Sequence, residues 1–342
     1  MKFGTDYASC RANFLSTAES AGVTVAHHVH PALPDAAVDV VTLGNGPEIR
    51  AIVSGAHGVE LPFGSAVQCA VLDERIQVPD NATLVLIHAI NCYGAVHRRR
   101  FTDGNIDLCR NFATPPHATN TFYEVLAPHI NASPENAPEA DTALASQQAS
   151  MGPDFIAGIM GGQFDDPAGF SYGGAEPTWS RQVLEHILEP LAHRAESAMV
   201  LDLHTGVGPF AEPTFVCLQT GAALARARAL FGNDLIAPLD RTDTGTALHP
   251  AVGHPTEGYE RLFANVPVTS VVLEMGTYPP QETLPVLIQE HRYHRHGLAD
   301  GTAAHEIRQR MWEQHAPADE DWQRRAREAG IDAVTRLLRS TG

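Results

Sequence analysis

Residues 197–206 read SAMVLDLHTG, and this stretch indicates the class of fold. It is an almost uniformly apolar run, which is typical of a strand buried on both faces of a parallel sheet. The run reaches His204 just before Gly206, so we expect the imidazole at the end of the strand. Asp202 lies two positions earlier and therefore on the same side of the pleat, where it could support the histidine. The stretch thus predicts a buried strand that carries a histidine to the edge of a sheet.

Comparable strands and helices are spread along the rest of the chain. Apolar runs predict strands at 82–91 and 266–276, and residues 38–54 predict two strands joined as a hairpin by the turn GNGP. Helical spacing occurs between and after them, at 63–74, 179–196, 221–231 and 281–296. We therefore expect an α/β fold with a mixed, mostly parallel central sheet flanked by helices.

Polar side chains stand at or just beyond the ends of several predicted strands. They are His57, Asn91, His204 and Glu274. Sites in sheets of this kind gather at the carboxyl ends of the strands. This shared position separates these residues from most of the 18 histidines of the chain.

The domain organisation is expected to be simple. We predict a single domain over residues 1–342. Residues 131–178 are rich in Ala, Ser, Pro and Gly, which predicts long loops. From about residue 281 the chain is charged and helical in pattern, and 322–340 predicts an amphipathic closing helix whose arginines face water.

Composition excludes several classes of function. The formal net charge of −17 argues against nucleic-acid binding, which needs a concentrated basic surface. No apolar run is long enough to span a bilayer, and no secretory signal is readable, so we expect a cytoplasmic protein that does not enter the membrane. The five scattered cysteines predict reduced thiols. A cluster of three arginines at 98–100 favours an anionic ligand over a solvated loop.

A metal site is suggested by SGAHGVE, residues 54–60, in which His57 and Glu60 are three positions apart after an apolar run. Spacing alone proves nothing, because three other His-x-x-Glu pairs exist: His186/Glu189, His193/Glu196 and His254/Glu257. The first two share one predicted helix opposite an apolar stripe, which indicates a solvated face. The third pair, His254/Glu257, lies in a predicted loop that does not directly follow a predicted strand. The pair in SGAHGVE alone follows a strand and is bracketed by turn-forming residues.

A catalytic zinc ion typically takes three protein ligands and leaves a position for water. His204 is the natural third ligand beside His57 and Glu60. Glu274 stands at another strand end, where a carboxylate among apolar residues is costly unless it is used. Two histidines and one carboxylate favour zinc, with one ion per chain, although such ligands also accept other divalent ions.

The order of these motifs resembles the zinc carboxypeptidase superfamily. The resemblance is to the branch near aspartoacylase and succinylglutamate desuccinylase, and to bacterial metallopeptidases whose activity is uncharacterised. Its motifs are GAHGVE, INCYGAVHRRRFTDGNIDLCRNF, LDLHTG and VVLEMGT, which together span residues 55–277. The resemblance implies a phosphorylase/hydrolase-like fold and a single catalytic domain.

Roles for individual residues follow from the resemblance. His57, Glu60 and His204 correspond to the zinc ligands, and Glu274 to the general base. One arginine of the Arg99/Arg100 pair corresponds to the arginine that polarises the scissile carbonyl, and Arg100 is favoured. The remaining residues implied to bind substrate are Arg110, which corresponds to the arginine that holds a substrate carboxylate, and Arg99, Cys109, Asn111 and Tyr259.

Two cysteines depart from the pattern of the superfamily. Cys109 replaces the asparagine that usually precedes the arginine at position 110, and Cys92 replaces the proline of Asn-Pro-x-Gly. A thiol is a weak hydrogen-bond donor, so the departure at 109 affects recognition of a terminal carboxylate. The alternative is that Cys109 is a small buried residue beneath the site.

The implied function is zinc-dependent hydrolysis of an amide bond. A metallocarboxypeptidase acting on small peptides, or on peptide-like substrates with a carboxylate near the scissile bond, is favoured. An N-acyl amino acid deacylase of the aspartoacylase type needs the same residues and stays open, as does a non-catalytic zinc-containing binding protein. The expected partner is a small-molecule or peptide substrate with a carboxylate, and the sequence is compatible with a homo-oligomer.

Overall fold

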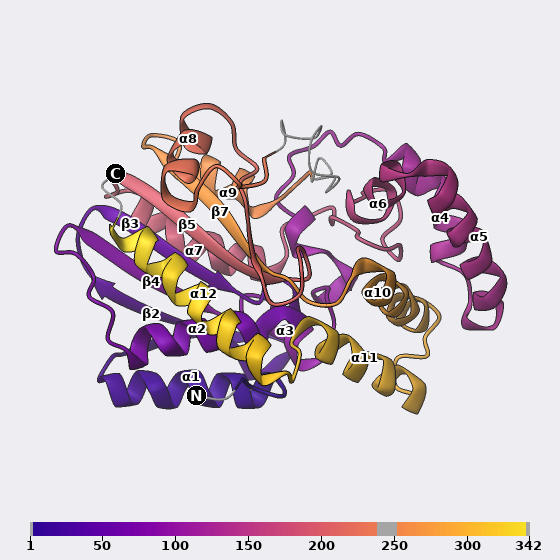
Figure 1. Ribbon diagram of the computed structural model, residues 1–342, viewed down its shortest axis with the longest axis horizontal. Helices are drawn as coiled ribbons and strands as arrows, with labels where there is room; N and C mark the ends of the chain where they lie inside the picture. The colour runs from indigo at the N-terminus through magenta and orange to yellow at the C-terminus, as the bar shows by residue number, and fades with distance from the viewer. Residues whose placement is uncertain (1–2, 238–251, 340–342) are drawn as a thin grey trace.

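A single sheet forms the centre of the computed structural model, which describes residues 3–237 and 252–339 (Figure 1). In the described part of the chain the strands are arranged in the order β1-β2-β4-β3-β5-β7-β6. They span Val25–His30 (β1), Leu33–Gly44 (β2), Glu48–Ser54 (β3), Ala82–His88 (β4), Ser197–Thr205 (β5), Pro213–Val216 (β6) and Val268–Met275 (β7).

The four strands in the middle of the sheet, β4, β3, β5 and β7, run parallel to one another, whereas β1, β2 and β6 pair antiparallel with their neighbours. Every residue of β5 is buried, as expected for a strand covered on both faces. The parallel pairing aligns the carboxyl ends of β3, β5 and β7, so that Ser54 is level with Leu203, and His204 with Glu274. The predicted mixed, mostly parallel sheet is confirmed.

The predicted hairpin over residues 38–54 is wrong. Both strands exist and GNGP joins them, but β2 and β3 do not pair with each other. Instead β4 lies between them, antiparallel to β2 and parallel to β3. A turn signal describes only the local chain, whereas the insertion of a later strand depends on pairing between distant segments.

Helices cover both faces of the sheet and extend beyond its carboxyl edge (Figure 1). The α-helices span Tyr7–Ala21 (α1), Leu61–Asp73 (α2), Cys92–Val96 (α3), Thr121–Ile130 (α4), Ala137–Met151 (α5), Pro153–Met160 (α6), Trp179–Ala192 (α7), Gly221–Phe231 (α8), Pro255–Leu262 (α9), Pro280–Arg295 (α10), Thr302–His315 (α11) and Glu320–Arg339 (α12). Short 3-10 helices span Gly58–Glu60 (η1), Asp103–Asn105 (η2), Leu108–Arg110 (η3) and Pro134–Asn136 (η4).

Alternation of side chains along the strands gives each face of the sheet its own core. Ile52 and Leu201 point to the face covered by α2, α8 and α12, where they join a cluster that includes Trp322. Val53 and Val200 point to the opposite face and pack with residues of α7 and α9. Figure 1 shows α12 crossing the sheet beside α2, and these two helices are in contact. The core therefore fixes the strands from both sides.

A separate group of helices lies beyond the carboxyl ends of the central strands (Figure 1). Residues of α4, α6, α10 and α11 share a third apolar cluster, which contains Leu126, Ile159, Val286 and Met311. The prediction that residues 131–178 form long loops is wrong for 137–160, which form α5 and α6. Pro134, Pro138 and Pro153 occupy the first turns of helices, where a missing N–H costs no hydrogen bond.

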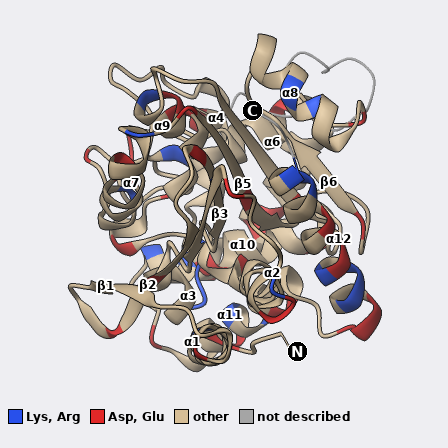
Figure 2. Cartoon of the chain, turned by 90° about the vertical axis from the view of Figure 1, so that its left-hand side faces the viewer, with Lys and Arg blue, Asp and Glu red and all other residues tan. Residues whose placement is uncertain are grey.

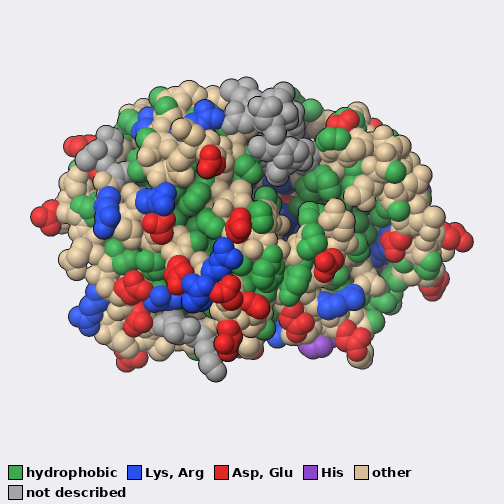
Figure 3. All heavy atoms as spheres, in the orientation of Figure 1, with side chains coloured by type: hydrophobic (Ala, Val, Ile, Leu, Met, Phe, Trp, Pro, Cys, Tyr) green, Lys and Arg blue, Asp and Glu red, His purple; other side chains and the backbone are tan. Residues whose placement is uncertain are grey.

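The prediction of a helical, charged segment from about residue 281 is confirmed by α10, α11 and α12. Figure 2 shows acidic and basic residues along α12, and exposed ion pairs such as Arg324–Glu328 and Arg336–Asp332 lie there. Within residues 3–237 and 252–339, every helix is too short or too polar to cross a lipid bilayer. Figure 3 shows that one face of the molecule is hollowed near its centre, with Lys or Arg side chains visible inside the hollow.

Candidate metal centre

The segment after β3 presents His57 and Glu60 on one side of a tight turn. Gly55 makes the turn possible because its φ of 71° lies in the left-handed region. Gly58 allows a close approach of the backbone, since a Cβ there would lie 2.1 Å from the carbonyl carbon of Gly94. η1 follows directly, and α2 begins at Leu61. The glycines of GAHGVE therefore shape the loop that carries the two polar side chains.

Glu60 joins the two histidines. Its Oε1 lies 2.8 Å from Nδ1 of His57, and its Oε2 lies 2.9 Å from Nδ1 of His204. The backbone N–H of Thr205 also donates to Oε2 at 3.2 Å. The centroids of the two imidazole rings are 5.0 Å apart. Burial opposes ionisation of Glu60, but His57 and His204 hold the pKa of its carboxyl well below the usual range.

A second carboxylate stands behind each histidine. Oδ1 of Asp202 lies 3.2 Å from Nε2 of His204, as predicted, although this contact lacks the geometry of a hydrogen bond. Oδ1 of Asp107 lies 3.3 Å from Nε2 of His57, and its Oδ2 accepts a hydrogen bond from the hydroxyl of Ser171 at 3.0 Å. Burial opposes ionisation of Asp107, but Arg100 and His57 hold its pKa well below the usual range. Sequence reasoning missed Asp107, although it lies inside a quoted motif.

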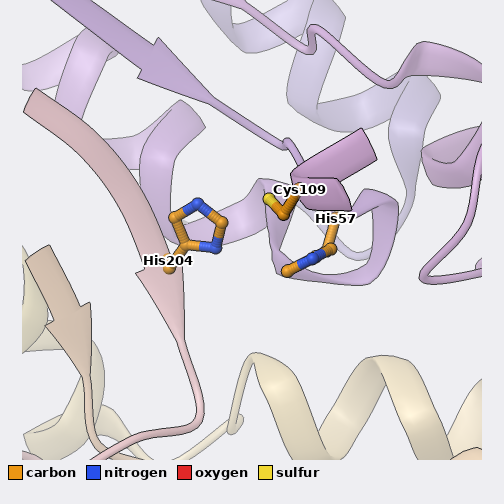
Figure 4. Close-up of side chains that lie close together, drawn as sticks. All are labelled: His57, Cys109 and His204. Carbon is orange, nitrogen blue, oxygen red and sulfur yellow. The ribbon is translucent and has the colours of Figure 1, made fainter. Parts of the chain in front are cut away.

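Cys109 completes the cluster. It lies in η3, and its backbone N–H donates to Oδ1 of Asp107 at 3.0 Å. One ligand atom from each of Cys109, His57 and His204 lies within 4.8 Å of the others, and Figure 4 shows the sulfur between the two rings. In the described residues this is the one group of His, Cys, Asp or Glu side chains with such mutual spacing of ligand atoms.

The thiol of Cys109 differs from the others in its surroundings. Burial opposes its ionisation, but His57 and His204 lower the pKa of Cys109 below the usual value. Burial instead raises the pKa of Cys10 and Cys92 to about 12 and that of Cys69 to about 11. All five cysteines are free, as predicted.

Glu274 lies on β7, level with His204 on the neighbouring strand. The side chain is half-buried, and among the described residues its Oε2 has no hydrogen-bond partner. Burial is the main reason that the pKa of Glu274 rises to about 7, and the lowering effect of His204 offsets it only in part. A carboxylate with a free oxygen therefore stands beside the cluster.

Arg100 is the arginine that the structure brings to the cluster. Its Nη1 lies 3.4 Å from Oε1 of Glu60, and its Nε lies 3.6 Å from Oδ2 of Asp107. Arg99 instead points to α10, where its Nε lies 2.8 Å from Oε1 of Glu290. Neighbours in the arginine cluster thus point to different parts of the molecule.

The other residues implied to bind substrate are largely engaged with the protein itself. Arg110 donates from Nε to the carbonyl of Met160 at 3.1 Å, from Nη2 to the same carbonyl, and from Nη1 to the carbonyl of Cys109 at 2.5 Å. Within residues 3–237 and 252–339 this uses three of its five N–H donors and leaves two. The amide of Asn111 donates to the carbonyls of Gly173 and Glu176 at 2.8 and 3.0 Å and accepts from the N–H of Thr178 at 2.8 Å.

Tyr259 belongs to α9 and is fully buried in the core between this helix and the sheet. Its hydroxyl has no partner among the described residues. His254, from one of the competing pairs, caps α9 at its N-terminus with Nδ1 2.9 Å from the hydroxyl of Thr256. It lies close enough for the charges of His204 and Arg110 to help lower its pKa, although burial is the main cause. The competing pairs on and just after α7, His186/Glu189 and His193/Glu196, are exposed as predicted.

The donor atoms suit a zinc ion. Two imidazole nitrogens and two carboxylate oxygens converge, each imidazole has a carboxylate behind it, and a thiol lies against both rings. Imidazole and thiolate are ligands that zinc prefers, and outer carboxylates of this kind orient histidine ligands. His57 and His204 can hold a metal ion with Glu60 alone or with Cys109 as well.

Known structures share this fold. Bovine thrombin-activatable fibrinolysis inhibitor, solved with tick carboxypeptidase inhibitor, matches with a TM-score of 0.53 at 10% identity, over 98% of this chain and 96% of that chain. Carboxypeptidase A of Helicoverpa armigera matches with a TM-score of 0.52 at 13% identity, over 93% and 75%. A Shewanella amazonensis protein assigned to the succinylglutamate desuccinylase/aspartoacylase family has a TM-score of only 0.36 at 19% identity, over 80% and 72%. The class is therefore a carboxypeptidase-like α/β fold with a candidate metal centre at the carboxyl ends of its central strands.

The chain itself belongs to the family described as "Protein of unknown function (DUF2817)", whose profile matches residues 3–328. No curated protein matches its sequence. The predicted zinc carboxypeptidase-like fold is confirmed by the structural matches.

Proposed function

We propose that this protein is a zinc-dependent hydrolase of amide bonds, acting as a metallocarboxypeptidase on small peptides or peptide-like substrates with a carboxylate near the scissile bond. One observation carries the proposal. The Nδ1 atoms of His57 and His204 meet the two oxygens of Glu60 at 2.8 and 2.9 Å, at the end of β5 beside Glu274. Metal donors and a proton acceptor are thereby combined in one place.

His57, Glu60 and His204 would hold the zinc ion, and the carboxylates of Asp107 and Asp202 would orient the two imidazoles. When bound, zinc supplies a Lewis acid for the scissile carbonyl and lowers the pKa of an attacking water to about 7. The residues present fit a zinc ion because their nitrogen and oxygen donors converge in a buried site. The outer carboxylates lie where they can fix the orientation of the imidazoles.

Glu274 would take the proton of the attacking water and then deliver it to the leaving nitrogen. Its position beside His204 and its unpaired Oε2 support this role. Arg100 would donate hydrogen bonds to the oxygen of the carbonyl as negative charge develops there. Its guanidinium is already near the donor set, 3.4 Å from Glu60.

Arg110 would bind the substrate carboxylate with the two N–H donors that the carbonyls of Met160 and Cys109 leave free. A deacylase for N-acyl amino acids would use the same zinc, base and arginine, so the two activities differ in the acyl group of the scissile amide, which belongs to a peptide in the first case and to a simple acyl chain in the second. The other residues implied to bind substrate would instead support the shape of the site, because their polar groups are paired with the protein or buried in the core. They are Arg99, Asn111 and Tyr259.

The proposal is tested by measuring hydrolysis of N-blocked dipeptides and of N-acyl amino acids side by side, with zinc-loaded protein and after chelation. We expect chelator-sensitive release of the carboxyl-terminal residue from the dipeptides. Release from the acylated amino acids alone would identify a deacylase. Zinc uptake without hydrolysis of either class would favour a zinc-containing binding protein.

A further inference from the structure

We propose that Cys109 is a ligand of the same metal ion, so that the site has a thiolate donor beside His57, Glu60 and His204. This inference rests on the proposed function, because it concerns the same site. The sequence resemblance implies an asparagine at this position, and this chain has a cysteine there instead. It adds a sulfur donor to a set otherwise made of nitrogen and oxygen.

The candidate donor atoms lie close to one another. One ligand atom each from Cys109, His57 and His204 lies within 4.8 Å of the other two. In a tetrahedral zinc site, Zn–N bonds of about 2.0–2.1 Å and Zn–S bonds of about 2.3 Å place the ligand atoms roughly 3.4 to 3.6 Å apart. The upper limit of 4.8 Å exceeds this spacing by about 1.2 to 1.4 Å, so the three atoms lie near the spacing that a bound ion requires.

The backbone of Cys109 is held by a hydrogen bond to a residue of the site. Cys109 is 2% exposed and lies in η3, whose first turn is capped by Asp107. Oδ1 of Asp107 accepts the N–H of Cys109 at 3.0 Å and also lies 3.3 Å from Nε2 of His57. One carboxylate thus fixes the positions of the thiol and of an imidazole relative to each other.

The side chain of Cys109 is directed toward the two histidines (Figure 4). Figure 4 shows the sulfur of Cys109 directed between the rings of His57 and His204, which come from two other segments of the chain. A cysteine that served only as a small apolar residue would have no reason to face two imidazoles. This orientation supports a fourth donor beside His57, Glu60 and His204.

A thiolate donor has a chemical consequence for the choice of metal. Soft sulfur ligands favour zinc, cobalt and cadmium, whereas manganese and magnesium favour oxygen ligands. With Glu60, Cys109 and two histidines as donors, a position for water requires an increase in coordination number or the release of one protein ligand. Activity is then expected to respond to thiol-directed reagents that compete with the metal.

Cobalt substitution tests this inference without relying on activity. Protein freed of metal is loaded with one equivalent of Co²⁺, and its absorption spectrum is recorded in the visible and near-ultraviolet regions. A thiolate ligand gives an intense sulfur-to-cobalt charge-transfer band in the near ultraviolet, in addition to the weaker visible bands of the bound ion. We expect this band in the natural protein and in Cys217→Ser, a matched change of a buried cysteine outside the cluster. Cys109→Ser should lose the band but keep the visible bands.

Cobalt uptake with no charge-transfer band in the natural protein would overturn the inference and leave the proposed metal site intact. The same conclusion follows if Cys109→Ser retains the band. No cobalt uptake by the natural protein would overturn the metal site itself, and the inference with it. Should Cys109→Ser fail to fold, the spectra of the natural protein and of Cys217→Ser still decide whether a thiolate is bound.

Discussion

Asp107 and His57 are fifty positions apart in the chain, yet Oδ1 of Asp107 lies 3.3 Å from Nε2 of His57. The nitrogen on the other side of the ring, Nδ1, lies 2.8 Å from Glu60. The imidazole is therefore held between two buried carboxylates, of which one would share the metal and the other would fix the ring. This arrangement makes Asp107 a positioning residue for the candidate metal centre.

Asp107→Asn is expected to weaken zinc binding by about 10- to 100-fold, because an amide keeps the shape but loses the charge that orients the imidazole. Competition with a chromophoric chelator measures this affinity. Asp103→Asn is a suitable control, since the side chain of Asp103 is 43% exposed and lies outside the cluster. An affinity within twofold of the natural protein would show that Asp107 does not position the ligand.

Glu274→Gln should leave zinc content and fold unchanged and lower hydrolysis by about 10² to 10⁴, because the amide has nearly the same shape but cannot accept a proton. Steady-state rates on whichever substrate class proves active provide the measurement. The exposed Glu282→Gln serves as the matched control. Activity near that of the control would remove Glu274 from the role of base.

Glu290→Ala tests the separate role of Arg99. The pair is buried, with side chains 2% and 4% exposed, and Arg308 also lies 3.2 Å from Glu290. Removing the carboxylate leaves buried guanidinium charge without its partner, so the free energy of unfolding should fall by about 3–5 kcal/mol. Urea denaturation of Glu290→Ala and of the exposed Glu306→Ala provides the comparison. Equal stabilities would mean that the pair does not stabilise the fold and that Arg99 is free for another role.

His88 makes stability depend on pH. Burial lowers the pKa of His88 from 6.5 to about 4 in the folded protein. Between these values the unfolded chain binds a proton that the folded protein does not, so stability decreases as the pH falls through this window. From the two pKa values, the loss between pH 7 and pH 5 is about 2 kcal/mol for this residue.

His88→Phe removes the titrating group and keeps the stacking on Phe14, whose ring centroid lies 4.4 Å away. The variant should lose less stability between pH 7 and pH 5 than the natural protein, as measured by urea denaturation at both pH values. Replacing the exposed His193 by alanine should leave the difference unchanged. An equal pH dependence in His88→Phe and in the natural protein would contradict the account.

Much of the fold could be predicted from sequence because its strongest signals are local. The apolar runs that became β4, β5 and β7 have the length and uniformity of strands covered on both faces. The pairing order could not be predicted in the same way. β4 inserts between β2 and β3, and nothing in GNGP distinguishes that arrangement from a hairpin. The helices at 137–160 were missed because prolines and small residues were interpreted as loop signals, although the prolines begin helices.

The candidate site, like the fold, could be predicted from the sequence only in part. His57, Glu60, His204 and Glu274 could be proposed because each lies near the carboxyl end of a strand, and the structure brings all four together. The position of Cys109 could not be predicted, because it depends on how η3 is placed against the ends of two strands. Paired contacts also decide which arginine enters the site: Arg100 does, whereas Glu290 holds Arg99 away from it.

The most direct test of the central claim is the zinc content of the purified protein after equilibration with Zn²⁺ and removal of free metal, measured by elemental analysis. We predict about one zinc ion per chain, loss of that ion in His204→Ala, and full retention in His193→Ala, which changes an exposed histidine just after α7, outside the cluster. Zinc content in His204→Ala equal to that of the natural protein, or a natural protein that retains no zinc, would contradict the account.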